Sequence, residues 1–317
     1  MPIELTEDLL VDVATELGIS EPSLVEKDFH VTQILAVLSK LQSDDFKLIF
    51  AGGTCLSKTV STLGRMSEDI DFKLIPIDKG SGLSQGQLRS KLSKVKKQIS
   101  KLIGGSGYTA KIIKEENGNR HVEWEIEYLP MLNPAQALRP IIQVETTYCE
   151  YFENHQEHSF GSMMANVLPL ALEVDSFICV EATYTTAEKL VSLLRRIAGM
   201  ARELPWHDDR LVRHVYDIHV LNIGGLINRT ELVSILEGVI SWDAERFKNQ
   251  HLEFLQDPIA ECSIALDALN TNIKFSQNYT EFLGPLVYDQ AAETDFKIAL
   301  SSVTDLFDYF ICNQTKF

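Results

Sequence analysis

Residues 48–72 read Leu48-Ile-Phe-Ala-Gly52-Gly53-Thr54-Cys-Leu-Ser-Lys-Thr-Val-Ser-Thr-Leu-Gly-Arg-Met-Ser-Glu-Asp69-Ile-Asp71-Phe72. An apolar run that stops at two glycines predicts a buried strand followed by a tight turn, and a helix-length segment comes next. Asp69 and Asp71 then flank one apolar residue. Because positions i and i+2 of a strand point to the same face, we expect the two carboxylates to converge.

This arrangement predicts a site for a phosphate group and a metal ion. Two close carboxylates repel each other unless a cation lies between them, and hard oxygen ligands suit Mg²⁺. The glycines allow backbone N–H groups to approach an anion, and a helix that begins near Thr54 would direct its positive end toward that anion. We therefore expect Gly52, Gly53 and Thr54 to bind phosphate, and Asp69 and Asp71 to bind Mg²⁺.

A Walker A loop is the competing interpretation of the same stretch. Gly52 is followed after four residues by Ser57, Lys58 and Thr59, whereas the Walker motif requires a second glycine directly before the lysine. That glycine lets the loop wrap around the phosphates, so Ser57 counts against this interpretation. Lys58 is retained as a candidate nucleotide-binding residue.

The motif resembles that of the DNA polymerase β-like nucleotidyltransferase superfamily, which carries paired glycines, a helix and then Asp-x-Asp. More narrowly, the string Arg65-x-Ser67-x-Asp69-Ile-Asp71-Phe72 is similar to the AbiEii/AbiGii toxin family. The upstream string Glu26-Lys27-Asp28-Phe29 is similar to the family's Glu-Lys-Asp-Tyr. The resemblance implies an α+β fold with a polymerase-β-like core, a mixed sheet with flanking helices and a mostly helical C-terminal domain. It also adds Arg65 and Ser67 to the candidate nucleotide-binding residues.

Two C-terminal elements extend the resemblance. The run from Glu188-Lys189-Leu to Leu194-Arg195 resembles an element whose lysine is thought to hold the triphosphate, and Arg196 follows Lys189 at i+7 on the same helix face. Residues 213–217, Arg-His-Val-Tyr-Asp, resemble the family's Arg-Asp-x-Tyr-Asp, with His214 where aspartate is common. Asp217 is therefore the catalytic candidate of this element. A helix-stabilising ion pair between Arg213 and Asp217 is the alternative.

The activity that the resemblance implies is nucleotidyl transfer by a toxin of an abortive-infection toxin–antitoxin system. Such proteins bind an NTP with Mg²⁺ and move a nucleotide onto an acceptor, which in related toxins is the 3′ end of tRNA. An antitoxin encoded nearby, acting without a stable complex, and a monomeric toxin are further expectations. A small-molecule nucleotidyltransferase of the aminoglycoside type and a nucleotide-binding regulator without turnover remain open.

Nucleotidyl transfer with two Mg²⁺ ions calls for about three carboxylates. Asp69 and Asp71 supply two of them. We choose Glu145 as the third because it ends the hydrophobic strand that begins at Ile141. Glu125 and Glu127 are the runners-up. They rank behind Glu145 because both belong to a regular alternation of polar and apolar residues that is typical of a solvated strand face.

The charge distribution bears on the acceptor. The net charge is −16, which suits a cationic small molecule better than a nucleic acid. One segment differs, because residues 89–101 contain six basic side chains and no acid in an amphipathic helical pattern. That helix has either a solvated basic face or a binding face for a phosphate backbone. The candidate nucleic-acid residues are Arg89, Lys94, Lys97 and Lys101.

The remaining features bound the domain organisation. At 317 residues the chain predicts two domains, an α/β nucleotidyltransferase domain over 1–160 with its N-terminal helices, and a helical domain over 161–317 that contributes Lys189 and Asp217. A capping box at Thr185–Glu188 is expected to open the helix that carries Lys189. Five scattered cysteines argue against a disulfide framework or zinc site, and no apolar run or signal sequence indicates a membrane or export, so we expect a cytoplasmic protein.

Overall fold

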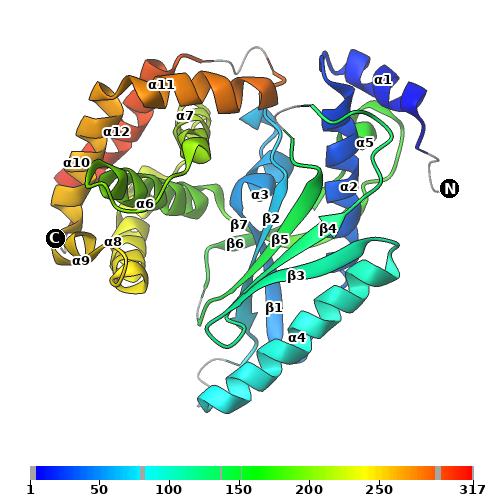
Figure 1. The fold of residues 1–317 in the computed structure, drawn as a ribbon, viewed down its shortest axis with the longest axis horizontal. Coiled ribbons are helices and arrows are strands. Elements are labelled where there is room, and N and C mark those ends of the chain that lie inside the picture. Colours follow the sequence, from blue (N-terminus) through cyan, green and yellow to red (C-terminus); the bar gives the residue numbers. More distant parts are fainter. Residues whose placement is uncertain (1–4, 79–82, 136–137, 151, 290–293, 316–317) are drawn as a thin grey trace. The chain divides into compact units, whose positions relative to one another are not determined.

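The computed structural model describes residues 5–78, 83–135, 138–150, 152–289 and 294–315, and it divides into two compact units. The first unit is Met1–Val180 and the second is Glu181–Phe317. The first is an α/β unit and the second is helical (Figure 1). Each unit has its own buried apolar core, so the two are described separately.

The α/β unit begins with two helices and then builds a sheet. Its elements are α1 (Glu7–Glu16), α2 (Pro22–Leu38), β1 (Phe46–Ala51), α3 (Gly52–Thr59), β2 (Asp69–Pro76), α4 (Gln85–Gly105), β3 (Thr109–Glu116), β4 (His121–Glu127), β5 (Ile141–Tyr148), β6 (His155–Phe160), α5 (Met163–Val167) and β7 (Val174–Val180). A short 3₁₀ turn, Ser61–Leu63, lies between α3 and β2. Strand β1 contains the apolar run predicted before the paired glycines, and β5 begins at Ile141 as predicted.

The sheet has seven strands in the order β3-β4-β5-β2-β1-β7-β6. It is mixed, because β2 runs parallel to β5 and β1 runs parallel to β7, whereas the other neighbours are antiparallel. The strands that carry the acidic motif are therefore in the middle of the sheet, where both edges of each strand are paired. This placement holds the motif's backbone rigidly.

The two faces of the sheet differ in chemistry. Burial alternates along β4, β5 and the first half of β2, so that residues such as Ile70, Trp124 and Val144 are fully buried while their neighbours are partly exposed. The apolar face packs against α4, whose Ser100 hydroxyl accepts a hydrogen bond from the Trp124 indole at 2.9 Å. Leu92, Val95 and Ile99 of α4 are buried at helical spacing. The opposite face is left polar.

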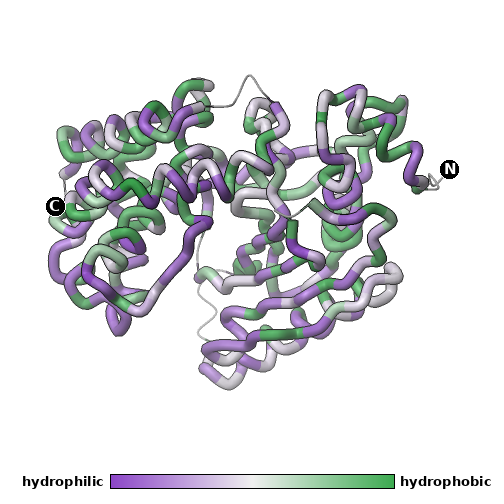
Figure 2. The backbone as a smooth tube through the Cα atoms, turned by 45° about the horizontal axis from the view of Figure 1, so that its top comes forward, coloured by the Kyte–Doolittle hydropathy of each residue, from purple (hydrophilic) through white to green (hydrophobic). Residues whose placement is uncertain are grey.

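The second unit consists of packed helices. They are α6 (Ala182–Ala201), α7 (Arg213–Ile223), α8 (Arg229–Phe247), α9 (Leu252–Gln256), α10 (Pro258–Thr271), α11 (Ile273–Asn278) and α12 (Phe296–Asn313). Short 3₁₀ turns at Asp209–Val212 and Gly284–Leu286 and a π-helical turn at Tyr279–Leu283 interrupt them. Polar and apolar residues alternate along the helical coils, as amphipathic helices require (Figure 2).

Three features of the chain differ from the sequence predictions. Strand β7 continues the sheet to Val180, beyond the boundary predicted at residue 160, because it pairs with both β1 and β6. Helix α3 begins at Gly52 rather than at Thr54. The capping box predicted at Thr185–Glu188 is wrong, since α6 already begins at Ala182 and Thr186 donates a hydrogen bond to the Ala182 carbonyl within it. Over the described ranges, no helix is both long and apolar enough to cross a membrane.

Candidate active site

The polar face of the sheet carries a row of acidic side chains across three adjacent strands. Asp71 on β2 is the register partner of Glu145 on β5, and Glu145 is in turn the partner of Glu123 on β4. Asp69 lies on the same face, two residues before Asp71, and is paired in register with Gln143. Since register partners have Cβ atoms about 5 Å apart, the sheet gathers four carboxylates into one patch.

Gly52 brings the start of α3 against this row. Its φ of +77° is a left-handed conformation that glycine adopts without steric cost. A Cβ atom at this position would lie 2.0 Å from Asp71 Oδ2 and 2.8 Å from its carboxyl carbon. Ala51, the residue before it, is the register partner of Asp71. Only a residue without a side chain therefore fits between the helix start and the Asp71 carboxylate.

A side chain of α3 fixes the first turn of this helix to β2. Thr54 is fully buried, and its hydroxyl donates a hydrogen bond to the Asp69 carbonyl oxygen. Backbone N–H groups in the first turn of a helix have no acceptor within the helix, and they carry the positive end of its dipole. Gly52, Gly53 and Thr54 occupy that turn beside Asp71. The Thr54 side chain thus positions the turn, and the backbone N–H groups are the part of it that can bind an anion.

Arg139 organises the end of the row at Asp69. One guanidinium nitrogen, Nη1, donates to Asp69 Oδ1 at 2.8 Å and to Gln143 Oε1 at 2.7 Å. The amide of Gln143 then donates to Glu145 Oε1 at 2.8 Å. One chain of hydrogen bonds therefore runs from Arg139 through Gln143 to Glu145, and it holds these side chains in place on the polar face.

At the other end of the row, Glu123 on β4 is paired with basic side chains. Glu123 Oε1 lies 2.8 Å from Lys114 Nζ and 2.7 Å from His121 Nε2. Burial opposes ionisation of Glu123, but the hydrogen bonds from Lys114 and His121 outweigh it and lower the pKa of this carboxyl. Glu123 therefore carries a negative charge that is already compensated.

Glu145 is in the opposite situation. Burial raises the pKa of its carboxyl, and the negative charge of Glu123 raises it further. A cation bound beside Glu145 would relieve both effects, because it would stabilise the ionised form. The atoms of the row that could coordinate a metal ion are carboxylate and amide oxygens, which are the ligands that Mg²⁺ prefers. These residues fit a magnesium ion, with Asp69 and Asp71 as the candidate ligands.

A second grouping of potential metal ligands overlaps the same row. His121, Glu123 and Glu145 each offer one atom, and these atoms lie within 4.8 Å of one another. The ammonium of Lys114 already occupies Glu123 Oε1. That contact makes the Glu123 end less suited to a second cation than the Asp71 end.

The string Glu26-Lys27-Asp28 supports the site from α2. The Glu26 carboxylate accepts hydrogen bonds from the backbone N–H groups of Met131 (2.5 Å) and Leu132 (3.1 Å). Lys27 is fully buried, and its ammonium donates to the carbonyl oxygens of Arg139 (2.8 Å) and Ile141. Lys27 therefore fixes the segment that enters β5 and presents Arg139 to Asp69.

Lys58 and Arg65 have partners other than a bound nucleotide. The ammonium of Lys58 lies 2.6 Å from Asp28 Oδ1, and both side chains are almost fully buried. Arg65 is buried, and its guanidinium donates to the Met66 carbonyl oxygen at 2.8 Å. Ser67 is partly exposed, two residues before β2. The contacts of Lys58 and Arg65 fasten α3 and the turn before β2.

In the helical unit, Lys189 and Asp217 form an ion pair. Lys189 Nζ lies 2.9 Å from Asp217 Oδ2, and the Asp217 side chain is fully buried. This pair joins α6 to α7. Arg196, which lies two turns further along α6, forms an ion pair of 2.6 Å with Asp208. The structure thus brings Lys189 to Asp217 and directs Arg196 to a different carboxylate.

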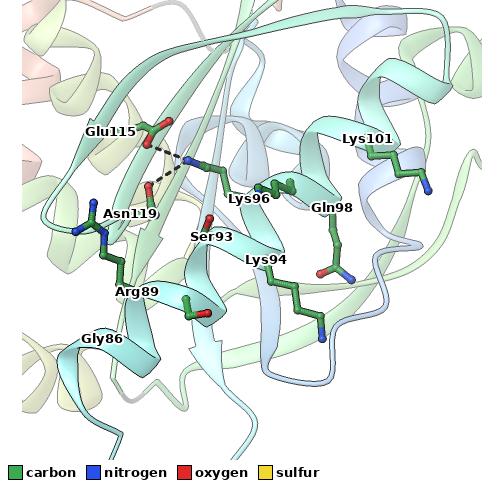
Figure 3. Close-up of a pocket in the computed structure, with 11 residues that line it drawn as sticks. Gly86, Arg89, Ser93, Lys94, Lys96, Gln98, Lys101, Glu115 and Asn119 are labelled. Atoms are coloured by element: carbon green, nitrogen blue, oxygen red, sulfur yellow. Dashed lines mark hydrogen bonds and ion pairs between the residues drawn. The ribbon is translucent and has the colours of Figure 1, made fainter.

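The basic helix predicted over residues 89–101 is α4, and its polar side lines a groove of about 820 Å³. Figure 3 shows Arg89, Lys94 and Lys101 along this groove, with Lys96 turned toward Glu115 and Asn119 of the β3–β4 hairpin. Lys94 is close to Asp44 and Asp45. Within the described ranges, Arg89, Lys97 and Lys101 have no carboxylate partner.

A family model described as the nucleotidyl transferase AbiEii toxin of type IV toxin–antitoxin systems matches residues 33–302. The chain belongs to this family. Among solved structures, the nucleotidyltransferase toxin MenT4 from Mycobacterium tuberculosis is 18% identical with a TM-score of 0.59, and the match covers 99% of this chain and 91% of that one. JHP933 from Helicobacter pylori is 12% identical with a TM-score of 0.44 over 97% and 93% of the two chains. No curated protein matches.

Family membership confirms that the chain is a nucleotidyltransferase, and the likeness to MenT4 confirms the predicted α+β fold with its mixed sheet and helical C-terminal region. Sequence reasoning missed Arg139, Gln143 and Glu123. Glu123 has the same period-2 signal as Glu125 and Glu127, and only the pairing of β4 with β5 distinguishes it. Arg139 and Gln143 carried no motif that could have indicated them.

Proposed function

We propose that this protein transfers a nucleotide from an NTP to an RNA acceptor, the 3′ end of tRNA, in a reaction that requires Mg²⁺. The observation that carries the proposal is the row formed by Asp71, Glu145 and their neighbours, with the first turn of α3 packed against it at Gly52. Carboxylates that gather metal ions beside a helix N-terminus provide the two elements that phosphoryl chemistry needs.

In this scheme the chain's residues take separate roles. The first-turn N–H groups of Gly52, Gly53 and Thr54 bind the phosphates, and Asp69 and Asp71 hold Mg²⁺. Bound Mg²⁺ would neutralise charge on the phosphates and on the leaving pyrophosphate. For Lys189 we propose the role that the resemblance implies, holding the triphosphate.

Glu145 is suited to accept a proton. The oxygen of the acceptor hydroxyl forms a bond to the α-phosphorus of the NTP, the bond to pyrophosphate breaks, and the hydroxyl proton passes to a base. Burial raises the pKa of Glu145, and a base is more effective when its pKa approaches the working pH. Arg139 and Gln143 support this role, because their hydrogen bonds hold the Glu145 carboxylate in one orientation.

The groove along α4 favours RNA as the acceptor. Arg89, Lys97 and Lys101 are cations without carboxylate partners in the part of the chain that the structure describes, and they lie along one helix of an otherwise acidic protein. Such a line of cations matches the spaced negative charges of a phosphodiester backbone. An antitoxin that acts without a stable complex, a monomeric toxin and a cytoplasmic location complete the proposal.

The acceptor is tested by supplying the protein with each of four α-labelled NTPs, Mg²⁺ and either total tRNA or a panel of aminoglycosides. We expect label on RNA of tRNA length, removable by treatment that trims the 3′ end. Label on the aminoglycosides alone would identify a small-molecule nucleotidyltransferase, which the net charge of −16 also suits. NTP binding without label on any acceptor would indicate a regulator.

A further inference from the structure

Arg139 uses only one of its three guanidinium nitrogens in contacts within the protein. This nitrogen, Nη1, donates to Asp69 Oδ1 at 2.8 Å and to Gln143 Oε1 at 2.7 Å. A guanidinium carries five N–H donors in a rigid planar fork. Nε and Nη2 donate no hydrogen bond to any residue that the structure describes. These two nitrogens form one edge of the fork, and that edge remains able to bind another group.

Solvent reaches this free edge of Arg139. Neither Nε nor Nη2 is a buried atom without a partner. The Arg139 side chain is 29% exposed, and the Asp69 side chain is 34% exposed. Lys58 differs in both respects, because it is almost fully buried and forms an ion pair with Asp28. An anion from solution can therefore reach the free edge of Arg139, whereas the charge of Lys58 is already neutralised inside the protein.

The main chain of Arg139 is fixed by two buried side chains. The ammonium of Lys27 donates to the Arg139 carbonyl oxygen at 2.8 Å, and Glu68 Oε2 accepts from the Arg139 backbone N–H at 2.9 Å. The Lys27 and Glu68 side chains are at most 2% exposed. Since the main chain and Nη1 are both held, the free edge has a defined position. A donor that is already in place loses little conformational entropy when it binds a ligand.

Asp69 has the complementary arrangement. Its Oδ1 accepts from Arg139, whereas Oδ2 accepts no hydrogen bond from a described residue. Asp71 follows about 7 Å further along the same face of β2. The first turn of α3 packs against Asp71 at Gly52. A free guanidinium edge, a free carboxylate oxygen and a helix N-terminus therefore lie along one short stretch of the acidic row.

We propose that Nε and Nη2 of Arg139 bind a phosphate group of the NTP substrate, while Asp69 Oδ2 binds the Mg²⁺ that accompanies this phosphate. The assignment rests on the proposed nucleotidyl transfer. Such an edge donates two parallel hydrogen bonds to phosphate oxygens. Because the cation and the carboxylate are joined through Nη1 and Oδ1, the pair recognises Mg²⁺ and phosphate as one ligand. Arg139 is therefore a substrate-binding residue in addition to its contact with Gln143.

The test measures the affinity of the full chain for Mg²⁺–tripolyphosphate and for each of the four Mg²⁺–NTPs by calorimetry. Arg139→Ala removes the guanidinium, and Arg139→Lys keeps the charge without the fork. Gln143→Leu retains the guanidinium but breaks its connection to Glu145. Arg139→Ala should weaken binding of tripolyphosphate and of the preferred NTP about 10- to 100-fold, because hydrogen bonds to a charged group are lost. Arg139→Lys should lose less, and Gln143→Leu should bind like wild type.

Arg120→Ala is the matched control for the loss of one positive charge. Its guanidinium lies 5.8 Å from the ring centre of Tyr148, at the other end of β5 from Gln143, so this variant should also bind like wild type. Unchanged affinity of Arg139→Ala for tripolyphosphate would overturn the assignment. Equal losses in Gln143→Leu and Arg139→Ala would overturn it too, because Arg139 would then act only through Gln143. An equal loss in Arg120→Ala would show a general effect of charge and would also contradict it.

Failure of this assignment can be distinguished from failure of the proposed function. If wild type binds Mg²⁺–NTP and Arg139→Ala does not, but no acceptor receives label, the transfer is wrong and the phosphate site at Arg139 stands. If wild type transfers label and Arg139→Ala binds both ligands normally, the transfer stands and the role of Arg139 is wrong. If wild type binds neither tripolyphosphate nor any NTP, both proposals are wrong.

Discussion

Gly52 links backbone conformation to the chemistry of the acidic row. Its positive φ and the 2.0 Å approach of a hypothetical Cβ to Asp71 Oδ2 both exclude a side chain. We expect Gly52→Ala to displace the Asp71 carboxylate and to lower the transfer rate by about 100-fold, because a shift of about 1 Å in reacting groups has effects of this size. The rate is measured with labelled NTP under saturating Mg²⁺.

Gly104 provides the control for this substitution. It lies in α4, and an added Cβ would meet no atom within 4 Å. Gly104→Ala should therefore retain the wild-type rate and gain up to about 1 kcal/mol in helix stability. Equal rates for Gly52→Ala and wild type would show that the contact between Gly52 and Asp71 does not matter for the reaction.

Glu145 is expected to reduce stability while it supports activity. Its pKa is raised by burial and by Glu123, so the folded protein binds the carboxyl proton more tightly than the unfolded chain does. Stability should then fall as pH rises from the ordinary glutamate pKa through the raised one, and ionised Glu145 is destabilising at neutral pH. Glu145→Gln should raise the urea midpoint at pH 7 and lower transfer by about 10²- to 10⁴-fold.

The pH dependence of activity and of stability distinguishes a role of Glu145 as a base from a purely structural role. Wild-type activity should decline as pH falls through the raised pKa of Glu145, whereas the stability gain of Glu145→Gln should shrink over the same interval. Denaturation curves and rates are measured on the same samples. A variant that is less stable than wild type at pH 7 would contradict the assigned direction of the pKa shift.

Helix α2 supports the active site through its buried Lys27. Lys27 is fully buried and joins α2 to the segment that enters β5 through two carbonyl oxygens, with Glu68 3.7 Å away. Lys27→Met should lower the free energy of unfolding by about 3–5 kcal/mol, because the buried Glu68 charge loses its cation and two carbonyl oxygens lose the ammonium donor. It should also lower activity, since Arg139 loses its support.

The pH dependence of Lys27 has a defined sign. Burial lowers the pKa of its ammonium to about 8, from 10.5 in the unfolded chain. Below pH 8 both states are protonated. Between pH 8 and 10.5 the unfolded chain retains the proton that the folded protein releases, so wild type should gain stability relative to Lys27→Met as pH rises. A constant difference in unfolding free energy across this range would contradict the lowered pKa.

Most elements of the α/β unit could be predicted from the sequence, because turn residues and apolar periodicity mark β1, β2, β5 and the basic helix α4. Strand β7 could not, since it joins the centre of the sheet by pairing with β1, which is distant in sequence. The acidic row illustrates the same limit. Asp69 and Asp71 follow from a period of two, whereas the place of Glu123 beside Glu145 depends on strand register, which no local pattern encodes.

The net charge of the whole molecule determines which residues can bind RNA. The net charge of −16 repels phosphate, so binding should depend on the few cations without carboxylate partners along α4. Replacing Arg89, Lys97 and Lys101 by alanine should reduce the slope of log affinity against log salt by about 2, because each phosphate contact to a single strand contributes about 0.7. Affinity for total tRNA is measured at several salt concentrations.

The control for this surface is Lys91, which lies 2.8 Å from Asp45 and is already paired. Lys91→Ala should leave the salt slope unchanged. If the triple variant and wild type have the same slope, RNA does not contact this groove, and the acceptor must bind elsewhere on the protein.

The acidic row on β2 and β5 is proposed to perform Mg²⁺-dependent nucleotidyl transfer. The most direct test is the initial rate of label transfer from NTP to total tRNA by wild type, Asp71→Asn and Glu127→Gln, with and without Mg²⁺. Glu127 is exposed at the end of β4 and serves as the matched control. We predict transfer by wild type and Glu127→Gln only with Mg²⁺, and none by Asp71→Asn. Equal transfer by Asp71→Asn and wild type would contradict the claim.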